Sequence, residues 1–206
     1  MSLKDPLQAR SRQTMQRYVD AALRLVELER WEDVSVADLA AQANSSVGAF
    51  YARFGSKDAL LSVLDDHYAD ALVSLMSAFA DSEPGRFEAQ VRVLLTRLVQ
   101  FHAEHAGLAR TLVLRARVGG GHTYTENSNR IHAEVPGVIA HLGRCDDVPE
   151  GCGRTELSMP GALVYSAMRE QLLFPDAVPV PLQDADALVK VLTASFIGTA
   201  HALASR

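Results

Sequence analysis

The chain has few cysteines, few aromatic residues and no excess of positive charge. Its 206 residues include two cysteines and 6% aromatic residues, and the formal net charge is −5 at pH 7. Cys145 and Cys152 cannot build a disulfide framework for a chain of this size, so we expect free thiols and a cytoplasmic location, with a redox role for the pair left open. The acidic balance argues against a protein that binds nucleic acid through a uniformly basic surface.

Long apolar runs are also lacking. No run approaches the length that a helix needs to cross a bilayer, and no signal peptide is visible. The hydrophobic content of 48% is that of an ordinary core-forming protein. We therefore expect a protein that folds around its own core and has no membrane partner.

The first sixty residues are less acidic than the rest of the chain. They hold eight basic and eight acidic residues, whereas residues 61–206 hold twelve and seventeen. Lys4, Arg10, Arg12 and Arg17 gather near the N-terminus. This distribution predicts a modest electrostatic footprint for phosphate contacts in the N-terminal third.

Apolar residues recur at helical spacing from end to end, and no segment shows the alternation of a strand. Gly119–Gly121 should stop one helix, because three glycines are costly to hold in helical form. Pro136 falls inside another helical pattern, where it either kinks or divides the helix. The sequence predicts an all-α fold of about nine helices, at about residues 11–29, 36–43, 46–54, 57–82, 86–104, 108–118, 125–143, 155–173 and 183–204.

Residues 35–60 contain the most specific pattern in the chain. Ser35 precedes a short apolar stripe as a helix N-cap, and Asp38 follows three residues later, close to a capping box. Asn44 then suits a sharp turn, because asparagine tolerates left-handed backbone geometry. A second short helix runs from about Ser46 to Phe54. The size and the turn placement are those of a helix-turn-helix, whose second helix enters the DNA major groove.

The span from Arg17 to Leu61 resembles the DNA-binding domain of the TetR family of transcriptional regulators. The resemblance implies a three-helix helix-turn-helix domain at residues 1–56 and a helical ligand-binding and dimerisation domain at residues 57–206. The segments that carry it are Asp20-Ala21-Ala22-Leu23, Ser35-Val36-x-Asp38-Leu39-Ala40, Ser46-x-Gly48-x-Phe50-Tyr51-x-x-Phe54 and Ser56-Lys57-Asp58-x-Leu60.

Two positions depart from the family pattern, which usually has glycine where Arg30 and Asn44 stand. Arginine in a left-handed cap would cost about 1 kcal/mol. We therefore expect the first helix to end in a different way, with Trp31 fixing the connection to the second helix.

The recognition helix is short, so its first turns must supply the contacts with base edges. Val47 and Ala49 are small and apolar, which suits thymine methyl groups, and Gly48 lets the backbone approach the duplex closely. Tyr51 presents a hydroxyl group and Lys57 a point charge to the phosphates. The DNA contacts that the resemblance implies are Ser35, Ser46, Val47, Gly48, Ala49, Tyr51, Arg53 and Lys57.

Several of these side chains have a second interpretation. Phe50 and Phe54 are better suited to the core of the three-helix domain than to DNA. Tyr51 can be a packing residue with a solvated hydroxyl group, and Arg53 can be a solvated charge. Because the base-reading groups are few, we expect specificity to depend on DNA shape as well.

A single helix-turn-helix reads too little sequence, so we expect a two-fold dimer that reads half-sites about 34–36 Å apart, or a multiple of that. The resemblance places the dimer surface on the last two helices. The same side chains can instead face the core of one protomer. The candidates are Leu163, Ala167, Leu188, Leu192, Ser195, Ile197, Thr199 and Ala200.

The resemblance also implies a cavity among the C-terminal helices, whose occupant changes the spacing of the two DNA-reading domains. We expect no cofactor and no metal site, although His102 and His105 share a helix face as a metal-binding pair would. The apolar candidates favour a neutral or anionic effector, and each of them can also be plain core. The candidates are Met76, Phe79, Phe101, His102, Arg115, His132, Tyr165, Met168 and Arg169.

Three functions follow as hypotheses. The first is a ligand-responsive transcriptional regulator, in the form of a repressor that binds a palindromic operator as a homodimer and is released by a small molecule. The second is a DNA-binding regulator without a ligand, which a C-terminal domain without a cavity would favour. The third is an all-α enzyme, but no phosphate loop, nucleophile elbow or HExxH motif is present.

Overall fold

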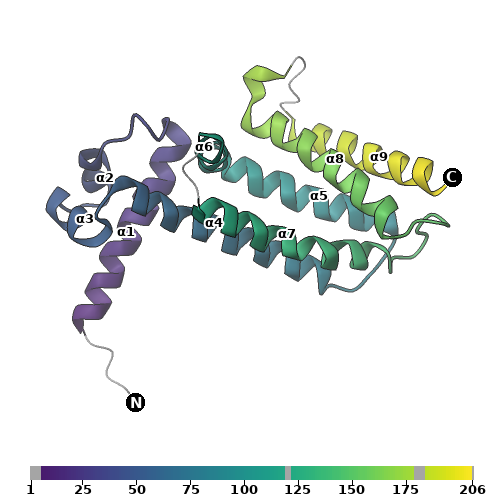
Figure 1. Cartoon of the computed structure of the whole chain (residues 1–206), viewed down its shortest axis with the longest axis horizontal. Coiled ribbons are helices and arrows are strands. Elements are labelled where there is room, and N and C mark those ends of the chain that lie inside the picture. The colour runs from purple at the N-terminus through teal and green to yellow at the C-terminus, as the bar shows by residue number, and fades with distance from the viewer. Residues whose placement is uncertain (1–5, 119–121, 179–183, 206) are drawn as a thin grey trace. The chain divides into compact units, whose positions relative to one another are not determined.

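The computed structural model describes residues 6–118, 122–178 and 184–205, which form nine α-helices and no strand (Figure 1). This confirms the all-α prediction. Lys4 and the glycines at 119–121, which the sequence argument used, lie outside the described residues. The helices are α1 Pro6–Leu28, α2 Val36–Gln42, α3 Val47–Phe54, α4 Lys57–Ala80, α5 Phe87–Glu104, α6 Ala106–Arg117, α7 His122–Leu142, α8 Arg154–Leu173 and α9 Ala185–Ala204, with a 3₁₀ turn, η1, at Pro175–Ala177.

The helices form two compact units. The first comprises Met1–Tyr68 and Gly107–Asn127, and the second comprises Ala69–Ala106 and Ser128–Arg206. The first unit therefore adds α6 and the start of α7 to the helix-turn-helix. This division by contacts differs from the division by function at residue 56, which stays a prediction.

The backbone explains how the chain ends α1 and turns between α2 and α3. The carbonyl of Arg30 accepts hydrogen bonds from the amides of Asp33 and Val34, at 2.9 and 3.3 Å, so a turn replaces the left-handed cap of the family. Trp31 is 1% exposed and fixes this connection, as expected. Asn44 has a φ of 47°, which confirms the predicted left-handed turn. Pro136 lies inside an uninterrupted α7 and so does not divide that helix.

In the first unit, the N-terminus of α6 is docked on the last turn of α1. The Glu27 carboxylate accepts hydrogen bonds from the amides of Gly107 and Leu108, at 2.7 and 3.1 Å. An acidic group at a helix N-terminus satisfies unpaired amides and complements the helix dipole. The two backbones approach so closely that a Cβ atom on Gly107 would lie 2.1 Å from the carbonyl oxygen of Val26. Only glycine fits at this crossing.

Replacing Gly107 with alanine is expected to destabilise the protein, because the rigid backbone of α1 must move to admit the methyl group. Overpacking of this kind costs about 1–3 kcal/mol, and each kcal/mol lowers the melting temperature by about 2–4 °C in a chain of this size. Gly137→Ala is the matched control, since its Cβ would make an ordinary 3.5 Å contact with the Ala80 side chain. Equal melting temperatures for the two variants would show that the crossing is not tight.

In the second unit, α9 packs against both α5 and α8 (Figure 1). The loop before α8 secures the start of α5. Asp147, at a φ of 56°, accepts hydrogen bonds from the Phe87 amide at 2.9 Å and from the Arg86 guanidinium at 2.9 and 3.0 Å. The Phe87 amide, followed by Arg86, lowers the pKa of the Asp147 carboxyl. This loop therefore fixes the N-terminal end of α5, and His102 lies near the C-terminal end of the same helix.

Candidate DNA-binding helix and effector site

Serine caps position both short helices of the helix-turn-helix. Ser35 and Asp38 form a complete capping box, in which the Ser35 hydroxyl accepts from the Asp38 amide and the Asp38 carboxylate accepts from the Ser35 amide at 2.9 Å. The Ser35 hydroxyl also donates to the Asp38 carboxylate, and this hydrogen bond, followed by the one from the Ser35 amide, lowers the pKa of the Asp38 carboxyl. The Ser46 hydroxyl accepts from the Ala49 amide at 3.2 Å and begins α3. The sequence signals for both caps are confirmed.

Aromatic side chains hold the inner face of α3 against α1. Phe50 is fully buried, and its ring meets Tyr18 edge-on with centroids 5.5 Å apart. Phe54 meets the same tyrosine edge-on at 5.7 Å. The Tyr18 hydroxyl also donates to the Ser46 carbonyl at 2.7 Å, so it fixes the start of the helix. Phe50 and Phe54 therefore belong to the domain core, as expected.

The outer face of α3 projects into solvent. Val47 and Tyr51 are 42% and 52% exposed, although both are large apolar or aromatic side chains. Gly48 lies between them on the surface, and a Cβ atom there would meet nothing closer than the Ser46 hydroxyl at 4.0 Å. Ala49 is half-buried. Val47, Gly48 and Tyr51 form one continuous surface, which we call the α3 outer face.

Two predicted DNA contacts have structural partners. The Arg53 guanidinium donates to the Ser11 carbonyl and hydroxyl group, both at 3.0 Å, so it ties α3 to α1. The Lys57 ammonium donates to the carbonyls of Trp31 and Val34, the latter at 2.7 Å, and lies 4.9 Å from the Trp31 ring centroid. Burial lowers the pKa of Lys57. The ammonium group of Lys57 therefore joins the α1–α2 connection to the start of α4, and its role as a DNA contact stays a prediction.

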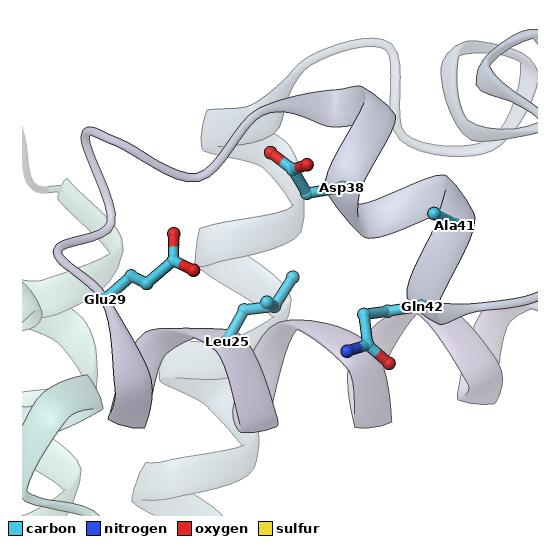
Figure 2. A pocket seen from close by; sticks show the side chains of 5 residues that line it. All are labelled: Leu25, Glu29, Asp38, Ala41 and Gln42. Carbon is cyan, nitrogen blue, oxygen red and sulfur yellow. The ribbon is translucent and has the colours of Figure 1, made fainter.

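A groove lies between the C-terminal turn of α1 and helix α2 (Figure 2). It is lined by Leu25, Glu29, Asp38, Ala41 and Gln42, with the carboxylate of Glu29 directly after α1 and that of Asp38 on α2. Two carboxylates repel phosphate groups. The groove therefore carries negative charge, whereas the α3 outer face has no acidic side chain.

In the second unit, three of the predicted effector residues meet in one cluster, formed by His102, Tyr165 and Arg169. His102 is 1% exposed, and its Nδ1 lies 2.8 Å from the Leu98 carbonyl oxygen. A carbonyl only accepts, so Nδ1 carries the proton and Nε2 accepts from the Tyr165 hydroxyl group at 3.3 Å. The Arg169 guanidinium lies 5.8 Å from the Tyr165 ring centroid, within cation–π distance.

The remaining effector candidates differ in burial and in the unit to which they belong. Met76, Phe79, Phe101 and Met168 are buried in the second unit. Arg115 belongs to the first unit and is paired with Asp58, and His132 is exposed on α7. The assignment of these two basic side chains to the effector site stays a prediction. Helical spacing predicts whether a side chain lies on the apolar or the polar face of its helix. It does not show to which unit that side chain belongs.

Burial lowers the pKa of His102 to about 4. The unfolded chain therefore binds a proton near pH 6.5 that the folded protein excludes down to about pH 4, so stability falls as the pH decreases through that window. The loss reaches roughly 3 kcal/mol at the acid end. His102→Gln is expected to flatten this dependence in urea unfolding between pH 7.5 and 4.5, whereas the exposed His132→Gln keeps it. A His102→Gln slope equal to that of the wild type would contradict the assignment.

The possible metal ligands and the two cysteines are the other candidates for specialised chemistry. Among the described residues, no group of three or more histidine, cysteine or acidic side chains could hold a metal ion. His102 and His105 each place Nδ1 2.8 Å from a carbonyl of their own helix. Cys145 and Cys152 are free, and burial raises the pKa of both thiols, which disfavours the reactive thiolate.

The last two helices expose small and apolar side chains at helical spacing. Leu188, Leu192 and Ala200, which were dimer candidates, are buried within the protomer, so the core interpretation is correct for them. Leu163, Ala167 and Ser195 are exposed, whereas Ile197 and Thr199 are half-buried. The exposed set, which we call the α8–α9 outer face, is Met159, Ala162, Leu163, Ser166 and Ala167 on α8 and Val191, Ala194, Ser195, Gly198 and Ala202 on α9.

Tyr18 is the positioning residue that sequence reasoning missed. It carries the aromatic contacts and the hydrogen bond that orient α3. Its only sequence signal is its place beside the apolar stripe of α1, where a tyrosine does not stand out from other core residues.

These features define the class of the protein. A capped, rigidly held α3 with an exposed outer face, followed by a larger helical unit, is the arrangement of a helix-turn-helix DNA-binding regulator. Residues 19–64 match the family model described as bacterial regulatory proteins, tetR family. No curated protein matches the sequence.

Solved structures of regulators match almost the whole chain. A TetR-family regulator from Mesorhizobium loti has a TM-score of 0.66 at 16% identity, with 95% of this chain and 97% of that chain covered. One from Streptomyces coelicolor has a TM-score of 0.68 at 19% identity, with 92% and 82% covered. One from Thermus thermophilus has a TM-score of 0.64 at 17% identity, with 88% and 97% covered. Residues 19–64 thus match the tetR family model, and the chain as a whole has the fold of these solved TetR-family regulators.

Proposed function

We propose that this regulator binds a palindromic operator as a homodimer, represses transcription there, and is released by a small-molecule effector in the cytoplasm. The observation that carries the DNA-binding part is the α3 outer face. Val47 and Tyr51 are exposed there and Gly48 lies at the surface, whereas Phe50 and Phe54 on the same helix pack in an aromatic cluster with Tyr18.

The chemistry of the α3 outer face fits a duplex. The Val47 side chain can contact a thymine methyl group, and the Tyr51 hydroxyl can donate to a phosphate. The N-terminus of α3 carries no acidic residue in its first turn, so its amides favour an approaching phosphate. Arg53 and Lys57 contribute positive charge nearby while holding the fold. Ser35 sits at the start of α2, where the family resemblance also implies a phosphate contact.

The α8–α9 outer face supports the homodimer. Met159, Leu163 and Val191 are 52%, 58% and 50% exposed, which is unusual for side chains of this size. Small residues between them allow two helices to approach closely. Helix α9 is also long and apolar enough to cross a membrane by length and composition, with a mean hydropathy of 1.5 over its best window. One such helix is weak support for a membrane span. A second copy of the chain would cover this apolar face equally well.

The His102, Tyr165 and Arg169 cluster supports an effector site in the second unit. It joins a buried neutral ring, a hydroxyl group and a guanidinium among buried apolar side chains. A few convergent polar groups in an apolar setting are the usual form of a small-molecule site. A regulator without a ligand remains the second candidate, and an enzymatic role has no motif to support it.

The test begins with capture of genomic DNA fragments by the purified full-length protein. A metabolite library is then screened for compounds that raise its melting temperature, and each hit is added to the protein–DNA complex. The proposal expects at least one hit to release the captured fragment in a gel-shift titration. If fragments are captured but every stabilising compound leaves the complex intact, the regulator without a ligand is the better description.

A further inference from the structure

We infer that the N-terminal half of α1 binds the phosphate backbone of DNA beside the bases that α3 reads. The inference rests on the proposed function, since it adds a second, sequence-independent surface to the same protein–DNA interface. We call residues 6–17 the basic half of α1. Three observations support a phosphate-binding surface there, namely its charge, its exposure and its hydrogen bonds with α3 and the turn before it.

The basic half of α1 carries charges of one sign only. It contains Arg10, Arg12 and Arg17 and no acidic residue. Residues 39–57, which include the turn and α3, hold two basic residues and again no acidic one. Residues 20–38, by contrast, hold six acidic and two basic residues, and both carboxylates of the groove belong to them. Positive and negative charge are therefore separated along residues 6–57, and the positive charge lies on the segments next to the reading helix.

The basic half of α1 is helical although it adds little to the core. Figure 1 shows it running beyond α2 and α3. Tyr18 is the first buried residue of α1 among those whose side chains the structure describes. Of the seven residues before it, only Thr14 is half-buried, and the other six are exposed. A helical segment that buries no apolar face gains little stability from packing, so its polar surface is available to a partner.

Hydrogen bonds place the basic half of α1 beside α3 and the turn before it. The Arg53 guanidinium of α3 donates to the carbonyl and the hydroxyl group of Ser11, both at 3.0 Å. The Arg17 guanidinium donates to the Asn44 carbonyl in the turn at 3.3 Å and to the Thr14 hydroxyl group at 3.2 Å. A duplex that contacts the α3 outer face therefore comes within reach of the basic half of α1.

Phosphate groups are the part of the duplex that this surface fits. Guanidinium groups bind phosphate oxygens through charge-assisted hydrogen bonds, and exposed glutamines such as Gln13 also donate to phosphates. Such contacts carry no sequence information, so the surface should strengthen binding to any DNA. An acidic protein segment has the same sign of charge, but α3 brings DNA, and not such a segment, to this position.

The experiment measures the salt dependence of DNA binding by the full-length protein. Wild type and the double variant Arg10→Gln/Arg12→Gln are titrated with a captured fragment and with unrelated DNA, by fluorescence anisotropy between about 50 and 200 mM salt. Each phosphate contact contributes about 0.9 to the slope of log K against log salt concentration. The slope of the variant should therefore be smaller by about 2 for each bound protomer, and both DNA sequences should be affected alike.

Two further variants serve as controls. Arg24→Gln/Arg30→Gln makes the same charge change at exposed positions within the acidic residues 20–38 and should keep the wild-type slope. Arg10→Lys/Arg12→Lys keeps the charge and should keep most of the slope, because lysine binds phosphate as a point charge. This pair of results separates a phosphate contact from damage to the helix and from a general effect of net charge.

The inference is overturned if Arg10→Gln/Arg12→Gln binds with the wild-type slope, or if Arg24→Gln/Arg30→Gln lowers the slope equally. In either case the capture of DNA by wild type would leave the proposed function intact. A wild-type protein that captures no DNA would instead remove the proposed function and this inference together.

Discussion

Replacing Val191 with arginine is expected to convert the proposed dimer into a monomer and to weaken binding to a palindromic operator by roughly 10²–10⁴-fold. Val191 is 50% exposed on α9, within the α8–α9 outer face. A charge at this position would be buried without a partner in a dimer, which costs several kcal/mol. The two recognition helices then act separately, and the gain from simultaneous binding to two half-sites is lost. Light scattering at micromolar concentration and a gel-shift titration measure the two effects.

Val93→Arg is the matched control for this variant. Val93 is 39% exposed on α5, outside the α8–α9 outer face, so the same substitution should leave both mass and DNA affinity unchanged. Leu163→Arg should reproduce the Val191→Arg result from the neighbouring helix. A wild-type protein that scatters as a monomer, or a Val191→Arg variant that remains dimeric, would remove the proposed interface.

Replacing Gly48 with alanine is expected to separate DNA binding from stability. The new methyl group has open space around it, since the nearest protein atom lies 4.0 Å away. Alanine is also the better helix former, so the free energy of unfolding should rise by about 0.5–1 kcal/mol. If the α3 backbone approaches the duplex as closely as proposed, the methyl group collides with DNA, and the affinity should fall by about tenfold or more.

A variant that is more stable and binds less well cannot be explained by damage to the fold. Gly137→Ala, which makes an ordinary contact on α7, is the control and should keep wild-type affinity. Unchanged operator affinity for Gly48→Ala would show that the duplex does not approach this part of α3.

Sequence reasoning predicted the fold well because its signals are local. Capping serines, the asparagine turn and helical periodicity each act within a few residues, and the structure confirms Ser35, Ser46 and Asn44 in these roles. The burial of Phe50 follows from the same local pattern, which assigns it to the core of the three-helix domain. Local rules are sufficient where a structure is determined by neighbours in the chain.

The remaining features depend on contacts between distant segments. Nothing near Lys57 in sequence shows that its ammonium group binds carbonyls of residues 31–34, and the same is true of Glu27 at the start of α6. Of the four polar effector candidates, only His102 and Arg169 meet, because their helices bring them together through Tyr165. Spacing along one helix could not distinguish them from Arg115 or His132.

The central claim is that the α3 outer face reads DNA as part of a dimer, and selection from random-sequence DNA tests it most directly. Wild type, Gly48→Ala, Tyr51→Ala and Val191→Arg are each carried through the same rounds of selection and sequencing. The account predicts that wild type enriches a palindrome with half-sites about 34–36 Å apart, or a multiple of that, and that the three variants do not. Enrichment of the same palindrome by Gly48→Ala and Tyr51→Ala, or no enrichment by wild type, would contradict it.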